Sequence, residues 1–181
     1  MDIIVTGAAG MIGNYVVRNL LEDGFKVIGI DNLWRGKKKY LENIKGFDLK
    51  EDFIFADLTK TSDIEFLEKK LIGSYCLVHL ADIVAGIGYV FNNEHSIYRE
   101  NLLINSNTIS LSRKLNIKKF IYVGTACSYP KHLQNGLNSV MKEDMLFPAI
   151  PESAYGWSKL MGTLEMNYAF LNSGVDYCTL L

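Results

Sequence analysis

The sequence predicts an α/β fold with a doubly wound parallel sheet. Short apolar runs rich in Val, Ile, Phe and Tyr recur along the 181 residues. The runs are continuous rather than alternating, which is typical of strands buried on both faces. Helical patterns lie between them, and strands that alternate with helices indicate a parallel sheet with helices on both faces.

Taken in order, the elements cover most of the chain. The expected strands are "DIIVT" at 2–6, "KVIGID" at 26–31, "DFIFAD" at 52–57, "SYCLVHLA" at 74–81, "KFIYVG" at 119–124 and "DYCTLL" at 176–181. The expected helices are 11–23, 62–72, 93–115 and 153–173. Right-handed crossovers fix much of the topology. The connections 32–50 and 126–152 lack a regular pattern, and long irregular loops in a compact domain are usually functional.

The length suits one domain over residues 1–181. The last apolar run ends with the chain at Leu181. Because a natural domain seldom finishes in mid-strand, we expect that a C-terminal part is missing.

Composition excludes several classes of function. Apolar residues make up 49% and charged residues 22%, as in ordinary globular proteins, and the net charge of −1 indicates no nucleic-acid or polybasic membrane surface. No signal peptide and no membrane-spanning run appear, so we expect a cytoplasmic protein. The three cysteines show no metal spacing, so no metal site is expected. Cys76 and Cys178 lie in apolar runs and are expected to be small buried residues on strands.

The first motif, "TGAAGMIG", joins a strand to a helix and predicts a dinucleotide site. Gly7 would permit the tight turn, Gly10 the approach of a phosphate, and Gly13 the packing of helix on strand. The helix start near Met11 and Ile12 offers free N–H groups and a positive dipole end to the pyrophosphate. A purely structural glycine turn is the alternative, but the motif has its required strand–turn–helix context.

Two acidic residues follow neighbouring strands. Asp31 would accept hydrogen bonds from the adenosine ribose, which favours NAD over NADP; a simple strand-end turn is the alternative, and the nearby Arg35 leaves NADP open. Asp57 would lie at the adenine edge or would start the next helix. The adjoining Asn32 and Leu58 are expected to contact the cofactor as well.

The second motif, "YGWSKL", places Tyr155 and Lys159 four residues apart on one helix face. A free tyrosine has a pKa of about 10, so it is a poor base near neutrality. A nearby ammonium and an oxidised nicotinamide both favour the phenolate, which would bring Tyr155 into the range of general acid–base catalysis. Thr125, after the fifth strand, would donate to a substrate oxygen and align the proton path. A surface Tyr/Lys pair and a strand-end threonine are the alternatives.

Together these motifs resemble the extended short-chain dehydrogenase/reductase family of nucleotide-sugar epimerases and dehydratases. The resemblance covers essentially the whole chain and implies a Rossmann-type fold, NAD as cofactor, and a catalytic triad of Thr125, Tyr155 and Lys159. It also implies cofactor contacts at Leu80 and Ala81 of "HLAD". A homodimer through the helices at 93–115 and 153–173 is expected from the same family.

Finer matches favour epimerisation. "HLADIVAGIGYVFNN" and "GTACSYPKH" are similar to segments of the GDP-mannose 3,5-epimerases, and the second also to the GDP-fucose synthases. By this resemblance, Gly86, Thr125, Ala126 and Cys127 contact a nucleotide-sugar substrate. Cys127 would be an acid/base beside a transient ketone, since a thiol with a reference pKa of about 8.5 can serve if a positive neighbour lowers it. The structural alternative is a small residue lining the loop.

Three further hypotheses stay open. They are a C4-epimerase, an NADPH-dependent keto-sugar reductase and a non-catalytic dinucleotide-binding protein. In the family the partner acid/base lies in a C-terminal substrate domain beyond the sixth strand, so we expect that the 181 residues alone are inactive.

Overall fold

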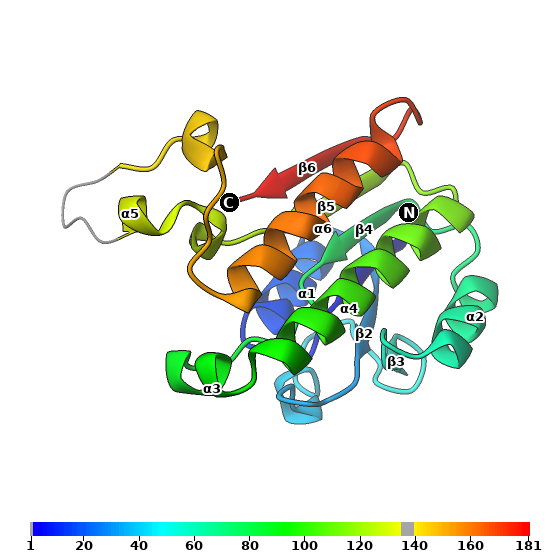
Figure 1. Cartoon of the computed structure of the whole chain (residues 1–181). Helices are drawn as coiled ribbons and strands as arrows, with labels where there is room; N and C mark the ends of the chain where they lie inside the picture. Colours follow the sequence, from blue (N-terminus) through cyan, green and yellow to red (C-terminus); the bar gives the residue numbers. More distant parts are fainter. Residues whose placement is uncertain (1, 135–139) are drawn as a thin grey trace.

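The computed structural model describes residues 2–134 and 140–181, which form one parallel sheet flanked by helices (Figure 1). The sheet has six strands in the order β3-β2-β1-β4-β5-β6, and every neighbouring pair is parallel. The strands are β1 (Asp2–Thr6), β2 (Lys26–Asp31), β3 (Phe53–Phe55), β4 (Cys76–His79), β5 (Lys119–Val123) and β6 (Asp176–Leu180). This is the doubly wound order, so the sequence prediction of a Rossmann-type sheet is confirmed.

The four predicted helices are present with shifts of a few residues at their ends. They are α1 (Gly13–Glu22), α2 (Thr61–Lys70), α4 (Glu94–Lys114) and α6 (Ala154–Phe170). The sequence did not predict the short elements in the loops: α3 (Ile87–Asn92), α5 (Lys131–Gln134) and 3-10 turns at Lys38–Tyr40 (η1), Ala126–Ser128 (η2) and Glu143–Leu146 (η3). Elements this short carry too few residues to show a helical period.

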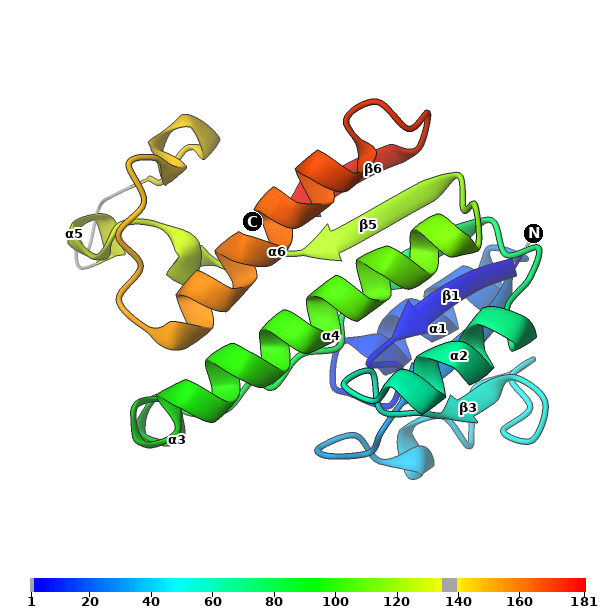
Figure 2. The same cartoon turned by 45° about the vertical axis from the view of Figure 1, so that its right-hand side comes forward.

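The helices form a layer on each face of the sheet. Figure 2 shows α2, α4 and α6 in front of the strands, with α1 behind β1. Because successive residues of a strand point to opposite faces, Ile4 belongs to the core under α2, α4 and α6, whereas Val5 belongs to the core under α1. Helices cover both faces of the sheet. The carboxyl ends of the strands stay uncovered, and ligands bind at these ends in such sheets.

The edge strand β6 corrects one prediction. Cys76 on β4 is buried as expected, but Cys178 on β6 is exposed. Tyr177 packs against Phe170 of α6, whereas its neighbours Asp176 and Cys178, on the other face, are exposed. The reason is that α1 packs on β1 and β2 and does not extend over β6. A continuous apolar run therefore indicated a strand correctly but did not indicate burial of both faces.

Within the described residues, no helix is long and apolar enough to cross a membrane.

Candidate active site

The glycine turn after β1 has the backbone geometry that the motif predicts. Gly7 has a φ of +69°, a left-handed conformation that favours glycine. A Cβ on Gly7 would also lie 2.9 Å from the backbone nitrogen of Ala81, so only glycine allows the loops after β1 and β4 to touch. A Cβ on Gly13 would overlap the carbonyl oxygen of Gly7 and lie 2.8 Å from the Cα of Ala8. The start of α1 therefore packs directly on the turn.

The amino end of α1 has no side-chain cap. Ile12 lies at the N-cap position, and the N–H groups of Asn14 and Tyr15 donate to the backbone carbonyls of Gly10 and Ile12 at 3.2 and 3.0 Å. A Cβ on Gly10 would meet only the carbonyl oxygen of Gly7, at 3.1 Å. Met11 and Ile12 are 79% and 57% exposed, unusual values for apolar side chains beside a buried turn. The geometry fits a phosphate at the helix end and a ligand that covers these two side chains.

Asp31 joins the end of β2 to the glycine turn. One carboxylate oxygen accepts the N–H of Ala9 at 3.0 Å and the other accepts the N–H of Leu33 at 2.7 Å. Burial raises the pKa of Asp31, and these two backbone N–H groups oppose that rise. Asp31 thus makes the strand-end turn, and each oxygen keeps a lone pair for a ribose hydroxyl. The neighbouring Asn32 is exposed, and its side-chain oxygen accepts the N–H of Trp34 at 3.0 Å.

Asp57 lies in the turn before α2 and has the contacts of a helix-start residue. Its Oδ1 accepts both the N–H and the hydroxyl of Thr59, at 3.0 and 2.7 Å. Leu58 is buried in the core, and its carbonyl accepts the side-chain amide of Asn107 at 2.7 Å. An adenine contact from Leu58 would therefore have to come from its backbone. The structure brings the Asp57–Leu58 segment to the carboxyl edge beside β2 but assigns it mainly to the start of α2.

Arg35, which left NADP open as a cofactor, is tied to the opposite loop. Its guanidinium donates to the carbonyl oxygen of Val84 at 2.6 Å. Trp34 and Tyr89 contact each other at the same place, with ring centroids 6.2 Å apart. The loop after β2 therefore contacts the loop after β4 and α3.

A buried polar network joins the ends of β1 and β4 to α4, and the sequence did not predict it. The hydroxyl of Thr6 accepts the N–H groups of Leu80 and Ala81 at 3.1 and 3.2 Å, so its proton goes to Nδ1 of His79, 2.7 Å away. Nε2–H of His79 then donates to Asn105 at 3.0 Å. Burial, and secondly the charge of Lys159, lower the pKa of His79 to about 3, so this side chain is neutral. Its signal in the sequence was a histidine inside the apolar run "CLVHLA".

The predicted triad residues Thr125 and Tyr155 come together at the carboxyl end of β5. The side chain of Thr125 lies near enough to Tyr155 to lower the pKa of the phenol, and Thr125 Oγ1 accepts the N–H of Cys127 at 3.2 Å. A Cβ on Gly156 would overlap the carbonyl oxygen of Cys127, so the first turn of α6 packs on η2. Ser153 caps α6 by accepting the N–H of Gly156 at 3.2 Å, which fixes where the helix begins.

Lys159 lies one turn further along α6, as predicted, but its ammonium is paired with a carboxylate. Lys159 Nζ lies 2.5 Å from Asp82 Oδ2, and the two side chains are 4% and 1% exposed. Asp82 follows Ala81 directly and was not among the predicted site residues. The sequence signal for this ion pair was an aspartate just after a buried strand. A carboxylate is almost never fully buried without a partner, so a paired cation could have been expected.

The expectation of an acidified tyrosine is not met in the chain alone. Burial raises the pKa of Tyr155, the negative charges of Asp82 and Cys127 raise it further, and only the hydrogen bond from Thr125 lowers it. The ammonium of Lys159 is paired with the carboxylate of Asp82, and it is not among the groups that act on the pKa of Tyr155. Tyr155 is a protonated phenol in this state.

The residues expected to contact the substrate are exposed or partly buried. Cys127 is a free, partly buried thiol, and Ala126 beside it is exposed. Gly86 precedes α3 and is exposed, with no atom within 4 Å of the position of a Cβ. Among the described side chains, no group of three or more His, Cys, Asp and Glu residues could hold a metal ion.

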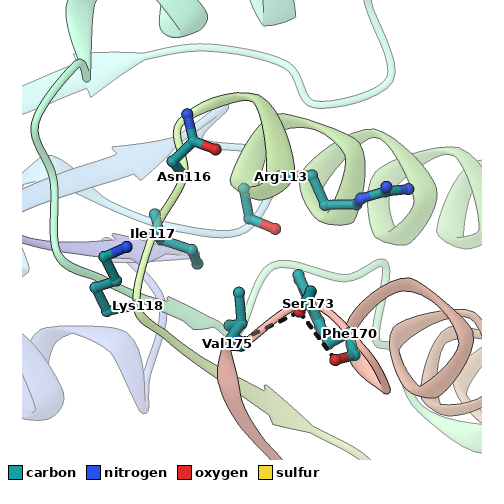
Figure 3. A pocket seen from close by; sticks show the side chains of 9 residues that line it. Arg113, Asn116, Ile117, Lys118, Phe170, Ser173 and Val175 are labelled. Atoms are coloured by element: carbon teal, nitrogen blue, oxygen red, sulfur yellow. Dashed lines mark hydrogen bonds between the residues drawn. The ribbon is translucent and has the colours of Figure 1, made fainter.

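Two hollows are separate from the glycine turn. One of about 220 Å³ lies at the opposite end of the strands, where the loops before β5 and β6 meet between Arg113, Lys118 and Val175 (Figure 3). The other, of about 460 Å³, lies between the amino ends of α4 and α6 and is lined partly by Tyr98 and Trp157. Neither includes the glycine turn or the triad.

The family model for the NAD dependent epimerase/dehydratase family matches residues 3–181, nearly the whole chain. This chain belongs to that family. The NAD expected from the motifs is therefore the cofactor in the family's own description. A GDP-mannose 3,5-epimerase from Arabidopsis thaliana is 30% identical over 164 residues, and a UDP-glucose 4-epimerase from Halalkalibacterium halodurans is 27% identical over 162 residues.

The solved relatives of this family member share its fold. A UDP-glucose 4-epimerase from Thermotoga maritima, solved with UDP-glucose, has a TM-score of 0.79 and 27% identity over 99% of this chain. The UDP-glucose 4-epimerase of Thermus thermophilus, solved with NAD, has a TM-score of 0.82 at 23% identity. The chain spans 40% and 43% of the two curated relatives and 54% of each of these two solved chains.

Proposed function

We propose that this chain carries the cofactor-binding half of an NAD-dependent epimerase that acts on a nucleotide sugar through a transient ketone. The observation that carries the proposal is that Thr125, at the end of β5, and Tyr155, in the first turn of α6, come together, with Lys159 one helical turn further on, at the same end of the sheet as the glycine turn. A dinucleotide-binding protein without chemistry has no need for this second arrangement.

The residues present fit NAD. The glycine turn and the positive end of the α1 dipole would hold the pyrophosphate, since Ile12 gives no side-chain cap and no side chain projects from Gly10. Asp31 would bind the adenosine ribose, and its negative charge disfavours a 2′-phosphate. Met11 and Ile12 would lose their exposure under the cofactor. Asn32, Asp57, Leu58, Leu80 and Ala81 line the same edge and are proposed contacts.

Bound NAD would supply a hydride acceptor that later returns the hydride, and in its oxidised form a positive charge beside the triad. Tyr155 would take the proton of the sugar hydroxyl that becomes the ketone. Thr125 would hold that hydroxyl and the phenol in line. Because Tyr155 holds its proton tightly in the chain alone, it needs added positive charge nearby before it can act as a base.

Cys127 would serve as the acid/base at the carbon beside the ketone. It lies in η2 next to Thr125, and its charge acts on Tyr155, so the thiol and the phenol share one site. Ala126 and Gly86 would form the exposed substrate side. We further propose a homodimer through the outer faces of α4 and α6, where Tyr98 and Trp157 are each 37% exposed.

The first test is NAD binding by calorimetry on the 181-residue chain. Gly10→Val places a side chain where the phosphate would lie and should abolish binding. Gly88→Val, at a glycine with open space around it, is the matched control and should bind as the parent does. Equal NAD binding by both variants would refute the proposed pyrophosphate site at the glycine turn.

The second test is turnover with GDP- and UDP-sugars, measured by product analysis on this chain and on the full coding product if it continues past Leu181. Tyr155→Phe should lower kcat by about 10²–10⁴-fold, the usual contribution of a general acid–base, and should leave NAD binding intact. Unchanged turnover in this variant would remove Tyr155 from the chemistry. Products inverted only at C4 would favour a C4-epimerase instead.

A further inference from the structure

The buried ion pair between Asp82 and Lys159 has no role in the mechanism above. Lys159 Nζ and Asp82 Oδ2 are 2.5 Å apart, and both side chains are almost fully buried. Oδ1 of Asp82 has no hydrogen-bond partner among the described residues. A carboxylate this deep costs free energy unless an ammonium compensates it, so its position is a specific feature of the site.

The loop that carries Asp82 is held on both sides. Before it, the N–H of Ala81 donates to Thr6 at 3.2 Å. After it, the side chain of Asn101 on α4 binds both backbone groups of Ile83: Oδ1 accepts the N–H at 2.7 Å and Nδ2 donates to the carbonyl at 3.2 Å. Asp82 is therefore fixed by residues of β1 and α4 and cannot follow Lys159 if the ammonium moves.

The ammonium of Lys159 is held by two groups outside its own helix. Besides Asp82, it lies 4.4 Å from the centroid of the Tyr122 ring on β5, a cation–π distance. Its spacing from Tyr155 places the two side chains on one helix face, but its charge is compensated by Asp82. The neutral His79 adds no charge to this cluster.

We propose that Asp82 is a positioning residue that acts as the counter-ion of Lys159 and keeps Tyr155 a phenol until cofactor binds. This inference rests on the proposed function, because the protonation of Tyr155 matters only if that residue moves protons. The groups that act on Tyr155 are Asp82 from the loop after β4, and Thr125 and Cys127 at the start of η2, whereas Lys159 on its own helix is paired with Asp82. Of these, Asp82 contributes the largest charge effect, since only burial raises the pKa of Tyr155 more.

The test is a pH titration of Tyr155 by NMR in the 181-residue chain labelled at tyrosine Cζ. Tyr155→Phe identifies the signal by its loss. In Asp82→Asn, the ammonium loses its counter-ion and the repelling carboxylate is gone. The titration midpoint of Tyr155 should therefore fall by one pH unit or more, which is at least a tenfold rise in phenolate at a given pH. The matched control is Asp2→Asn, which removes the same charge from a surface ion pair with Lys26 and should leave the midpoint unchanged.

A double variant separates charge from structure. Asp82→Asn combined with Lys159→Met removes both charges, so the titration midpoint of Tyr155 should fall less than in Asp82→Asn alone, because no uncompensated ammonium remains. A parent-like midpoint in Asp82→Asn, or an equally lowered midpoint in the double variant, would overturn the proposal. Thermal unfolding of each variant shows that it is folded, and the double variant keeps the test valid if the single one does not fold.

These measurements need neither NAD nor a sugar. If the chain fails to bind NAD while Asp82→Asn lowers the midpoint, the proposed function fails and the role of Asp82 stands. If NAD binds and Tyr155 proves essential while the midpoint stays unchanged, only the role of Asp82 fails.

Discussion

Replacing Thr6 by valine should remove the hydrogen bonds that hold the loop after β4 to the end of β1. The hydroxyl of Thr6 makes three hydrogen bonds, to the N–H groups of Leu80 and Ala81 at 3.1 and 3.2 Å and to His79 Nδ1 at 2.7 Å. Thr6 is 1% exposed, and valine has nearly the same shape, so the change removes the bonds without opening a cavity. Each buried partner left unsatisfied costs about 1–3 kcal/mol.

Because the two amides are only partly buried and can regain water, the total loss should be roughly 2–4 kcal/mol. For a chain of this length that corresponds to a Tm lower by about 5–15 °C. The assay is urea unfolding followed by circular dichroism. Thr6→Ser is the matched control: it keeps the hydroxyl and loses one methyl group, at a cost of about 1 kcal/mol.

NAD affinity should fall with stability in Thr6→Val, since Gly7 packs directly on the backbone of Ala81. If Thr6→Val were as stable as Thr6→Ser, the hydroxyl would not hold the loop, and the network drawn through His79 would be wrong.

Two further predictions concern buried charge. The pKa of His79 is about 3, below its ordinary value of about 6.5, so its contribution to stability is complete above pH 6.5 and is lost as the pH falls toward 3, by up to about 1.4 kcal/mol per pH unit. Urea unfolding at pH 7, 5 and 4 should show a shallower acid loss in His79→Gln; an equal loss would contradict a buried neutral histidine. Lys159→Met leaves Asp82 unpaired and should cost about 3–5 kcal/mol at pH 7. Burial raises the pKa of Asp82, so this variant should recover stability as the pH falls; a deficit independent of pH would show that Asp82 is not the cause.

The sheet and its order could be predicted from the sequence because strand burial and glycine turns are local patterns. "TGAAGMIG" predicted both the positive φ of Gly7 and the close packing at Gly13, since each depends on a few adjacent residues. The exposure of Cys178 could not be predicted, because it depends on which helix covers the far face of β6.

In the candidate site, too, the local features could be predicted from the sequence and the long-range contacts could not. Spacing on one helix correctly placed Tyr155 and Lys159, and Thr125 lies at the strand end where the motif put it. The charge balance around them could not be derived from that spacing. Burial of the phenol raises the pKa of Tyr155 in the chain alone, opposite to the direction expected, and Asp82 raises it further from another strand end, more than seventy residues away in the sequence.

This charge balance also bears on the proposed pairing of an acid with a base. A thiolate at Cys127 raises the pKa of Tyr155, so the phenol holds its proton more tightly while Cys127 is charged. When Cys127 takes a proton from the carbon beside the ketone, that repulsion disappears and Tyr155 releases its proton more readily. In the proposed epimerase, the charge on Cys127 would therefore control how readily Tyr155 moves the hydroxyl proton.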